Sequence, residues 1–236
     1  MTEAIILAGG LGTRLRDTVP DLPKPMAPIN GKPFLEHQMD YWISQGVTRF
    51  ILSVGFLREK IIAHFQHEYR GFEVVYAEET EPLGTGGGLL LAYKKLKNNA
   101  PFLIVNGDTF FEVDLNALKA FHQNHQASIT MALFKVAEND RYMGVQLNDD
   151  DGILKFKSEL GTSQLANGGV YMMNRHTLDN ITWQAGDKLS LEDDLFQNLL
   201  QTGNKMYGML YEGRFIDIGI PSDYHRAATM LVGKVD

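Results

Sequence analysis

The feature that most constrains this fold is a short apolar run near the start of the chain, residues 4–8, which ends in a pair of glycines. A uniformly apolar run without alternation is typical of a strand that is buried on both faces of a parallel sheet. A loop with glycine at positions 9, 10 and 12 follows the run directly. A strand that opens into a glycine-bearing loop favours an α/β fold, in which ligands bind at the carboxyl ends of the strands.

The remainder of the first half alternates between helical and strand patterns. Apolar residues at helical spacing over residues 34–45 stop at Gly46, and an apolar strand pattern resumes over residues 50–54. Further helices are predicted at 58–65, after the glycine cluster 84–88 and at 115–124, and further strands at 72–77 and 102–105. We therefore predict a doubly wound, mostly parallel, Rossmann-like α/β sheet.

Beyond residue 127 the pattern changes to strands joined by turn-rich segments. The predicted strands cover residues 128–134, 143–147, 153–156 and 169–173. Ser190 is a candidate helix cap before an acidic first turn, and two short strands and a terminal helix complete the chain. The second half is therefore predicted to be mixed and partly antiparallel, and to lie against the same sheet.

Length and charge limit the function classes. A chain of 236 residues without linker or repeat is predicted to form one domain over residues 1–236. Its formal net charge of −7 argues against nucleic acid or membrane partners, so an anionic ligand needs a local basic pocket. The absence of cysteine excludes disulfides and thiolate metal sites. No secretory leader or membrane span is recognised in the sequence, so the chain is expected to be cytoplasmic. The sequence does not decide between a monomer and a homo-oligomer.

The glycine loop is followed by three cations in an otherwise acidic protein. Arg14, Arg16 and Lys24 come soon after the glycines, and prolines flank Lys24. Glycine lets backbone N–H groups approach a phosphate, and nearby cations neutralise its charge. The Walker pattern fails because no Gly-Lys-Ser/Thr follows Gly12, and the dinucleotide fingerprint fails because Leu15 replaces its third small residue. A tight turn with solvated charges is the plain alternative to a phosphate site.

Six motifs in the same order along the chain resemble the sugar-1-phosphate nucleotidyltransferase family. They are Gly9–Leu15, Pro23–Met26, Glu79–Gly87, Asn106–Asp108, Asn167–Tyr171 and Asp217–Pro221. The resemblance covers essentially the whole chain, although the carboxy-terminal β-helix of some relatives is absent. Residues 25–36 and 106–111 look most like the guanylyltransferases that act on D-glycero-D-manno-heptose 1-phosphate.

This resemblance implies an Mg²⁺-dependent enzyme. It would transfer a nucleoside monophosphate from a nucleoside triphosphate, GTP in the first place, to a sugar 1-phosphate such as D-glycero-D-manno-heptose 1-phosphate, and release pyrophosphate. Residues 1–126 would then be a nucleotide-binding half and residues 127–236 a sugar-binding half. Uridylyl-, thymidylyl- and mannose-1-phosphate guanylyltransferases of the same family remain alternatives. A nucleotide-sugar-binding regulatory subunit without turnover is a rival from another class, which the retained charged residues argue against.

The family carry-over assigns the charged residues. Arg14 would stabilise the triphosphate, and Lys24 would contact the α-phosphate or the sugar phosphate. Asp108 and Asp217, each at the end of a predicted strand, would hold Mg²⁺, which takes oxygen ligands. Either aspartate alone beside glycine is more often a turn or helix cap.

The nucleotide-binding residues implied by the resemblance surround the loop and the second glycine cluster. They are Leu7, Gly9, Gly10, Gly12, Thr13, Glu79, Gly84 and Thr85. A carboxylate at Glu79 could accept hydrogen bonds from guanine N1–H and its exocyclic amine, which favours guanine over uracil or adenine. A solvated acidic rim formed with Glu78 and Glu81 is the alternative.

The sugar-binding residues implied by the resemblance lie in the second half. They are Gly144, Lys157, Glu159, Asn167, Gly168 and Gly169. Many relatives carry Glu-Lys two and three residues after a strand phenylalanine, whereas this chain reads Lys157-Ser158-Glu159 after Phe156. Either Lys157 and Glu159 act through a shifted loop or sugar binding departs from the usual pattern.

Overall fold

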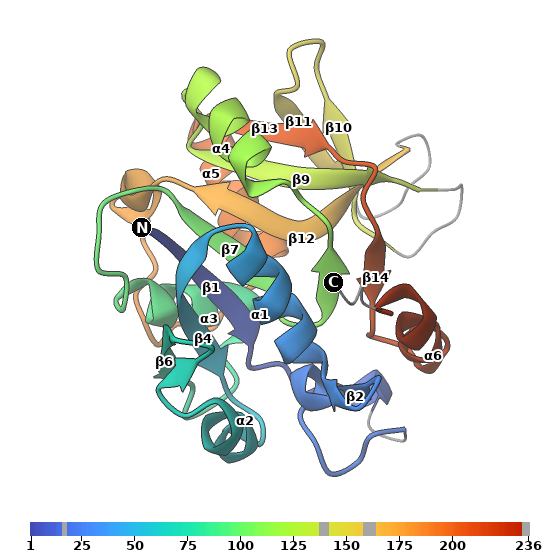
Figure 1. The fold of residues 1–236 in the computed structure, drawn as a ribbon. Helices are drawn as coiled ribbons and strands as arrows, with labels where there is room; N and C mark the ends of the chain where they lie inside the picture. The colour runs from blue at the N-terminus through green and yellow to red at the C-terminus, as the bar shows by residue number, and fades with distance from the viewer. Residues whose placement is uncertain (16–17, 137–141, 158–163, 233–236) are drawn as a thin grey trace.

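The first half of the protein is a parallel sheet. The computed structural model describes residues 1–15, 18–136, 142–157 and 164–232. Four parallel strands lie side by side in the order β7-β1-β4-β6 (Figure 1). Their bounds are β1 Thr2–Ala8, β4 Val47–Val54, β6 Phe72–Glu78 and β7 Phe102–Asn106, and the helices between them are α1 Phe34–Ser44, α2 Arg58–Phe65 and α3 Gly84–Tyr93. The predicted doubly wound sheet is confirmed.

The second half extends this sheet with antiparallel strands. Strand β12 pairs antiparallel with β7 and with β9, and β13 pairs parallel with β9. Strands β10 and β11 form a hairpin whose turn is closed by the Asn148 side chain, which accepts hydrogen bonds from the Asp150 and Gly152 N–H groups. The bounds are α4 Leu115–Asn124, β9 Ile129–Lys135, β10 Gly144–Leu147, β11 Ile153–Lys157, β12 Leu165–Met173 and β13 Met206–Leu210. The predicted mixed second half is confirmed.

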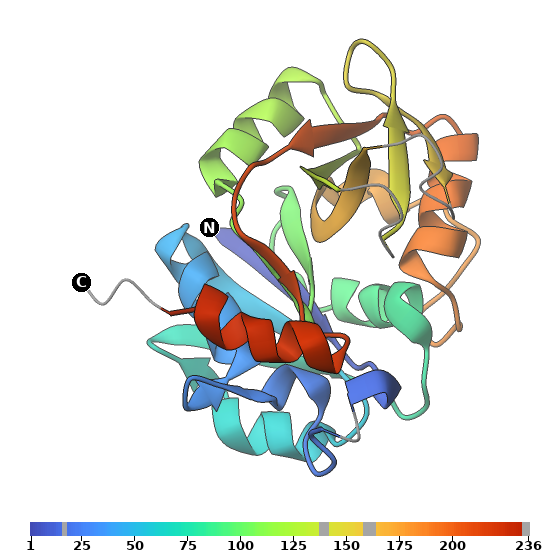
Figure 2. The same ribbon diagram turned by 90° about the vertical axis from the view of Figure 1, so that its right-hand side faces the viewer.

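Several short elements complete the chain. Helix α6 (Pro221–Met230), drawn in red, returns to the first half (Figure 2). Its Ala227 belongs to the same buried cluster as Ile29 and Phe34. The remaining strands are β2 Pro28–Ile29, β3 Lys32–Pro33, β5 Glu68–Tyr69, β8 Thr109–Phe111 and β14 Phe215–Asp217, and the remaining helical segments are η1 Thr13–Leu15, η2 Lys24–Met26, η3 Arg175–Leu178, η4 Leu191–Phe196 and α5 Gln197–Gln201. Among the described residues, none of the helices has the length and apolar character needed to span a bilayer.

The apolar run of β1 divides its side chains between two cores. Ala4 and Ile6 pack in one buried cluster with Trp42 of α1, and Ile5 packs in another with Leu89 of α3. Successive side chains of a strand point to opposite faces, so both faces of β1 are covered by helices. This explains the uniformly apolar sequence, and it leaves the carboxyl end of the strand as the place where β1 meets solvent.

The glycine cluster 84–88 was expected to precede a helix, but α3 begins at Gly84 and contains the cluster. The physical reason is close packing with the segment before η4. A Cβ on Gly86 would lie 2.8 Å from the Leu189 side chain, and a Cβ on Gly87 would collide with the Asp187 carbonyl. Ser190 caps the following helix as predicted, through a 3.1 Å hydrogen bond from the Asp193 N–H, but the first turn is π-helical.

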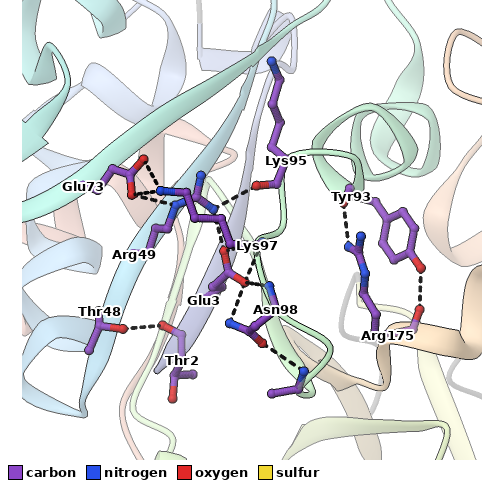
Figure 3. Close-up of polar contacts among 11 residues, drawn as sticks. Thr2, Glu3, Thr48, Arg49, Glu73, Tyr93, Lys95, Lys97, Asn98 and Arg175 are labelled. Carbon is purple, nitrogen blue, oxygen red and sulfur yellow. Dashed lines mark hydrogen bonds and ion pairs between the residues drawn. The ribbon is translucent and has the colours of Figure 1, made fainter.

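A cluster of charges lies at the amino-terminal ends of β1, β4 and β6, with a buried centre and a more exposed rim (Figure 3). We call it the amino-edge cluster, and its charged members are Glu3, Arg49, Glu73 and Lys97. Arg49 donates to Glu3 Oε1 at 2.5 Å and to Glu73 Oε2 at 3.0 Å. Glu3 also accepts from the backbone N–H groups of Lys97 and Asn98 and from the Asn98 side chain. Each buried charge therefore has several partners, as burial requires.

Candidate active site

A cavity of about 520 Å³ opens at the carboxyl ends of the parallel strands. It lies at the opposite end of the sheet from the amino-edge cluster, at the edge where open α/β sheets bind ligands. The cavity is lined by Leu7, Ala8, Gly9, Gly10, Leu11, Gly12, Lys24, Pro25, Ser53, Glu79, Pro82, Gly84, Thr85, Gly88, Asn106, Gly107, Asp108 and Lys188. The structure thus brings together nine of the predicted residues, which the sequence separates into four segments.

The glycines of the first loop serve different purposes. Gly9 packs against Glu79, since a Cβ there would collide with Glu79 Oε1, whereas a Cβ on Gly10 would meet no atom within 4 Å. Gly12 has φ +57°, and its missing side chain leaves room for Lys24, whose Cβ would lie 3.1 Å from a Cβ at position 12. The loop therefore fixes Lys24 and Glu79 as well as presenting open backbone to the cavity.

Lys24 and two aspartates approach one point at the cavity mouth. Lys24, which has a proline on each side, is the first residue of the single turn η2. Its Nζ lies 2.5 Å from Asp108 Oδ2. A Cβ on Gly219 would lie 3.1 Å from Lys24 Nζ and 2.7 Å from Asp217 Oδ1. We call Lys24, Asp108 and Asp217 the carboxyl-edge cluster.

Backbone pairing brings the two aspartates together from distant parts of the chain. Strands β8 and β14 pair antiparallel, with Asp217 opposite Thr109, and the Ile218 N–H donates to the Asp108 carbonyl at 2.9 Å. The Gly219 N–H donates to Asp217 Oδ1 at 2.6 Å, which orients that carboxylate. For Asp217 the turn alternative holds as well, because a carboxylate that accepts from the N–H two residues on forms an aspartate turn. The turn places this carboxylate near the Lys24 ammonium group, which Asp108 contacts directly.

Glu79 is buried in the cavity wall, with 6% of its surface exposed. Its Oε1 accepts from the Ser53 hydroxyl at 3.2 Å, and its Oε2 accepts from the Leu83 N–H at 3.1 Å. Glu78 and Glu81 are exposed, so the alternative of a solvated acidic rim holds for them and is wrong for Glu79. Each carboxylate oxygen keeps further acceptor capacity, because it carries two lone pairs.

The start of α3 is closed by the second half of the chain. Gly84 has φ +76°, and the N–H groups of Gly86 and Gly87 donate to the Leu189 carbonyl at 3.0 and 3.2 Å. Two of the free N–H groups of this helix end are therefore used within the protein. Thr85 is exposed and lines the cavity. Lys188 also lines the cavity, and it belongs to the segment before η4 that packs against α3.

The predicted sugar-binding residues occupy neighbouring strands. Gly144 of β10 pairs with Lys157 of β11 and with Ala166 of β12. Gly168 and Gly169 have packing reasons: a Cβ on Gly168 would lie 2.5 Å from the Phe111 ring, and Gly169 has φ +70°. Asn167 donates to the Tyr171 hydroxyl at 2.7 Å. Glu159 lies outside the described residues, so the structure does not place it.

Two predicted nucleotide contacts lie on the turn η1, which follows the glycine loop. Thr13 and Arg14 are the first residues of this turn, and the Arg14 side chain is exposed. Arg14 is not one of the described residues that line the cavity. Arg16 lies outside the described residues.

Other lining residues were not singled out from the sequence. Ser53 lies inside an apolar strand, Pro82 belongs to the Glu79–Gly87 motif without a separate signal of its own, and Gly88 is the last residue of the glycine cluster 84–88. Lys188 comes from a turn far along the chain, which only tertiary packing brings to α3. Its exposed position among polar residues gives no local sequence signal.

The donor set at the carboxyl-edge cluster suits a divalent cation with oxygen ligands. Two carboxylates face a single ammonium group here, and Mg²⁺ is commonly held by one or two carboxylates together with water and substrate phosphates. Among the described residues, no group of three or more His, Cys, Asp or Glu side chains could hold a metal by themselves. A cation at this cluster would therefore need ligands from a bound phosphate.

A doubly wound sheet whose carboxyl edge carries a cavity lined by a glycine loop, Lys24 and Asp108 is an arrangement that suits a protein acting on nucleotide phosphates. The sequence model of the nucleotidyl transferase family matches residues 3–233, and the chain belongs to this family. It is 40% identical over 224 residues to the D-glycero-alpha-D-manno-heptose 1-phosphate guanylyltransferase of Campylobacter jejuni subsp. jejuni, covering 94% of this chain and 97% of that one. The enzyme of the same name from Aneurinibacillus thermoaerophilus is 42% identical over 227 residues, covering 95% and 96%.

A solved structure agrees with these relatives. The crystal structure of HddC from Yersinia pseudotuberculosis superimposes with a TM-score of 0.83 at 32% identity, covering 98% of this chain and 99% of that chain. A further crystal structure of HddC is a complex with GMP-PN. The predicted family membership is confirmed.

Proposed function

We propose that this protein transfers GMP from GTP to D-glycero-D-manno-heptose 1-phosphate, releasing pyrophosphate and forming a GDP-sugar. Two relatives of that name match nearly the whole chain, and HddC has been crystallised with GMP-PN. The observation that carries the proposal is the carboxyl-edge cluster beside the glycine loop, in a cavity of about 520 Å³. This volume lies within the range of about 300–1,000 Å³ that is usual for small-ligand sites, so the cavity can hold a mononucleotide.

The reaction needs positive charge and alignment more than a base. The phosphate of a sugar 1-phosphate is ionised at neutral pH, so its oxygen can attack the α-phosphorus of GTP without losing a proton first. Lys24 would bind the α-phosphate oxygens, which gain negative charge in the transition state. Arg14 would bind the outgoing pyrophosphate, and its exposed position on η1 requires the side chain to turn over the cavity.

We further propose that Asp108 and Asp217 hold Mg²⁺ when the triphosphate is bound. The ion would neutralise phosphate charge and fix the triphosphate geometry. Lys24 Nζ lies 2.5 Å from Asp108 Oδ2, and a carboxylate has two acceptor oxygens, so Asp108 Oδ1 can take up a cation while Oδ2 keeps its lysine contact. Movement of the ammonium group to the α-phosphate would make Oδ2 available as well.

Guanine would be bound beside Glu79. This carboxylate is oriented by the Ser53 hydroxyl and the Leu83 N–H, and it lines the cavity next to Gly9. Its remaining lone pairs can accept the guanine N1–H and exocyclic amine, whereas uracil and adenine lack this pair of donors. Burial makes an unmatched base costly, because the carboxylate has lost water.

The proposal is tested by measuring pyrophosphate release with GTP, UTP, dTTP, CTP and ATP against heptose 1-phosphate, mannose 1-phosphate and an amino sugar 1-phosphate. We expect release with GTP and the heptose phosphate, dependent on added Mg²⁺. A clear preference for a pyrimidine triphosphate would overturn the base assignment. Binding of nucleotide without release under any pairing would support the regulatory subunit instead.

We also propose a cytoplasmic location, since a chain without cysteine agrees with a reducing compartment. Fractionation of cells expressing a tagged chain tests this, and recovery with the membrane fraction would contradict it.

A further inference from the structure

A chain of hydrogen bonds connects the cavity with the second half of the protein through Glu192. This residue lies on the π-helical turn η4, and its side chain is partly buried. The Tyr171 hydroxyl donates to Glu192 Oε1 at 3.1 Å, and the Thr85 hydroxyl donates to Oε2 at 3.3 Å. Neither the sequence motifs nor the proposed chemistry uses Glu192, although isolated π-helical turns are frequent at functional sites.

The hydrogen bonds that lead from Glu192 through Tyr171 to Asn167 all have their donors on the side away from Glu192. Because the Tyr171 hydroxyl donates its only proton to Glu192, its oxygen accepts from Asn167 Nδ2, which lies 2.7 Å away. Asn167 Oδ1 in turn accepts from the Gly169 N–H at 2.9 Å. The Glu192 carboxylate, acting through Tyr171, and the Gly169 N–H therefore favour the same orientation of the Asn167 amide, although Glu192 and Asn167 do not bond directly.

The hydrogen bonds on the Thr85 side are less dependent on Glu192. The Thr85 Oγ1 also accepts from the Leu191 N–H at 2.9 Å, so a backbone group fixes its position independently. Tyr171 is fully buried, and its hydroxyl is held by the side chains of Asn167, Glu192 and Asn106. Loss of Glu192 should therefore disturb the Tyr171 hydroxyl, and through it the Asn167 amide, more than Thr85.

The electrostatic setting agrees with this geometry. Burial raises the pKa of the Glu192 carboxyl, and hydrogen bonds from Tyr171, Thr85 and Asn106 oppose that rise. Burial and the neighbouring Glu192 charge raise the pKa of Tyr171 well above its usual value, so the phenol keeps its proton and remains a donor. Hydrogen bonds to an ionised acceptor in such surroundings are stronger than neutral ones.

We propose that Glu192 is a positioning residue that orients Asn167 through Tyr171 and thereby sets the affinity for the sugar 1-phosphate, while nucleotide affinity depends on it little. This inference rests on the proposed function, in which Asn167 contacts the sugar. Glu192 itself touches neither reacting phosphate in this account. Its effect is expected in the KM for the sugar phosphate.

The first experiment measures both KM values for Glu192→Ala, Glu192→Gln and Tyr171→Phe. We expect E192A and Y171F each to raise the KM for the sugar phosphate about 10-fold, the loss expected for one oriented hydrogen bond. The KM for GTP should change less than about 3-fold. E192Q keeps one acceptor oxygen for Tyr171 and should restore most of the affinity. Asp193→Ala removes a neighbouring exposed carboxylate and should behave as wild type.

The double variant E192A/Y171F separates a shared route from two independent effects. If Glu192 acts through Tyr171, the double variant should be no worse than either single variant. The inference would be overturned if the KM increase of the double variant equalled the product of the two single increases. It would also be overturned if E192A lost GTP affinity and sugar-phosphate affinity equally. An unchanged KM in E192A, with the melting temperature retained, would overturn it as well.

A second measurement does not depend on turnover. The side-chain amide resonances of ¹⁵N-labelled asparagine, with Asn167 assigned from Asn167→Asp, report the hydrogen bonds of that amide. They should shift in E192A and Y171F and stay in place in D193A. Unshifted Asn167 resonances in E192A would overturn the inference even if wild type released no pyrophosphate, which by itself would overturn only the proposed function.

Discussion

Two charged clusters lie at opposite ends of the same parallel sheet, and they differ in how fully their charges are satisfied within the protein. At the amino-edge cluster, Arg49 and Glu3 are each 2% exposed, and Glu3 accepts from Arg49, two backbone N–H groups and the Asn98 side chain. Every donor at Glu3 belongs to the protein itself. Such an arrangement stabilises the fold and leaves little capacity for a ligand.

The carboxyl-edge cluster is open by comparison. The side chain of Asp108 is 38% exposed and that of Lys24 is 10% exposed, and both face a cavity. Because the pair faces a cavity, its ammonium group can bind a phosphate and its carboxylate can bind a cation in place of the ion pair between them. The comparison teaches that ion pairs of similar length serve different purposes, according to whether water and ligand can reach them.

The largest expected effect separates activity from stability at the carboxyl-edge cluster. Asp108→Asn removes the charge that would hold the cation while keeping the shape of the side chain. We expect turnover in Mg²⁺ to fall about 10³-fold, the size seen when one electrostatic contact to a transition state is lost. The melting temperature should stay within about 2 °C of wild type, since Asp108 is partly exposed.

Pyrophosphate release and thermal unfolding, measured on the same preparation, check this prediction. An unaltered rate in D108N would place the cation elsewhere. A large fall in melting temperature would mean that the cluster is structural, like its counterpart at the other edge.

The reverse pattern is expected at the amino-edge cluster. Arg49→Met leaves Glu3 buried without its cationic partner, which should cost about 3–5 kcal/mol of unfolding free energy. Turnover per folded molecule should not change, because the cavity lies at the other end of β1. Arg70→Met is the matched control, since Arg70 is 57% exposed and its pair with Asp40 should contribute less than about 1 kcal/mol.

Urea unfolding of R49M and R70M gives both free energies. Equal values for the two variants would contradict the difference between a buried and an exposed ion pair.

Much of the fold followed from local patterns. The helices predicted at 58–65 and 115–124 have those bounds in the structure, and the second is capped by Asp114, whose carboxylate accepts from the Asn116 and Ala117 N–H groups. Spacing and caps are local properties, so they can be seen in the sequence. The start of α3 could not be predicted in this way, because its glycines are explained by the segment 187–190 packed against them.

The site was predictable only in part, for the same reason. The glycine loop and Lys24 are close in sequence, and their proximity follows from a short connection. The approach of Asp217 to Asp108 depends on the pairing of β8 with β14, and both strands are three residues long. Strands of this length carry no periodic signal. The position of Asp108 at the carboxyl edge followed from the predicted strand before it, whereas the assignment of both aspartates to one metal site came from family resemblance.

A smaller effect is expected within the glycine loop itself. Gly9→Ala places a methyl group against Glu79 Oε1 and must displace a buried carboxylate, which should cost about 1–3 kcal/mol of stability. Gly10→Ala is the control, because its methyl group would meet no atom within 4 Å. We expect its unfolding free energy to change by less than about 0.5 kcal/mol.

Thermal unfolding without nucleotide compares the two loop variants, so that effects on ligand binding do not enter. Equal stabilities would mean that Gly9 is required for the ligand and not for Glu79.

The smallest expected effect tests how solvent weakens an ion pair at the rim of the amino-edge cluster. Hydrogen bonds from Lys97 and then from Arg49 lower the pKa of Glu73 below its usual value of 4.5. Its side chain is 40% exposed, so Glu73→Gln should cost less than about 1 kcal/mol at neutral pH. A lowered pKa in the folded state stabilises the protein above pH 4.5, and that stabilisation is lost as the pH falls through the folded value.

Unfolding of wild type and E73Q by urea should therefore give curves that differ at neutral pH and converge on acidification. Added salt should also bring them together, because exposed charges are screened within about 10 Å at an ionic strength near 0.1 M. A difference that grows as the pH falls would show that Glu73 is stabilised in its protonated form. The amino-edge cluster would then have no solvent-screened rim.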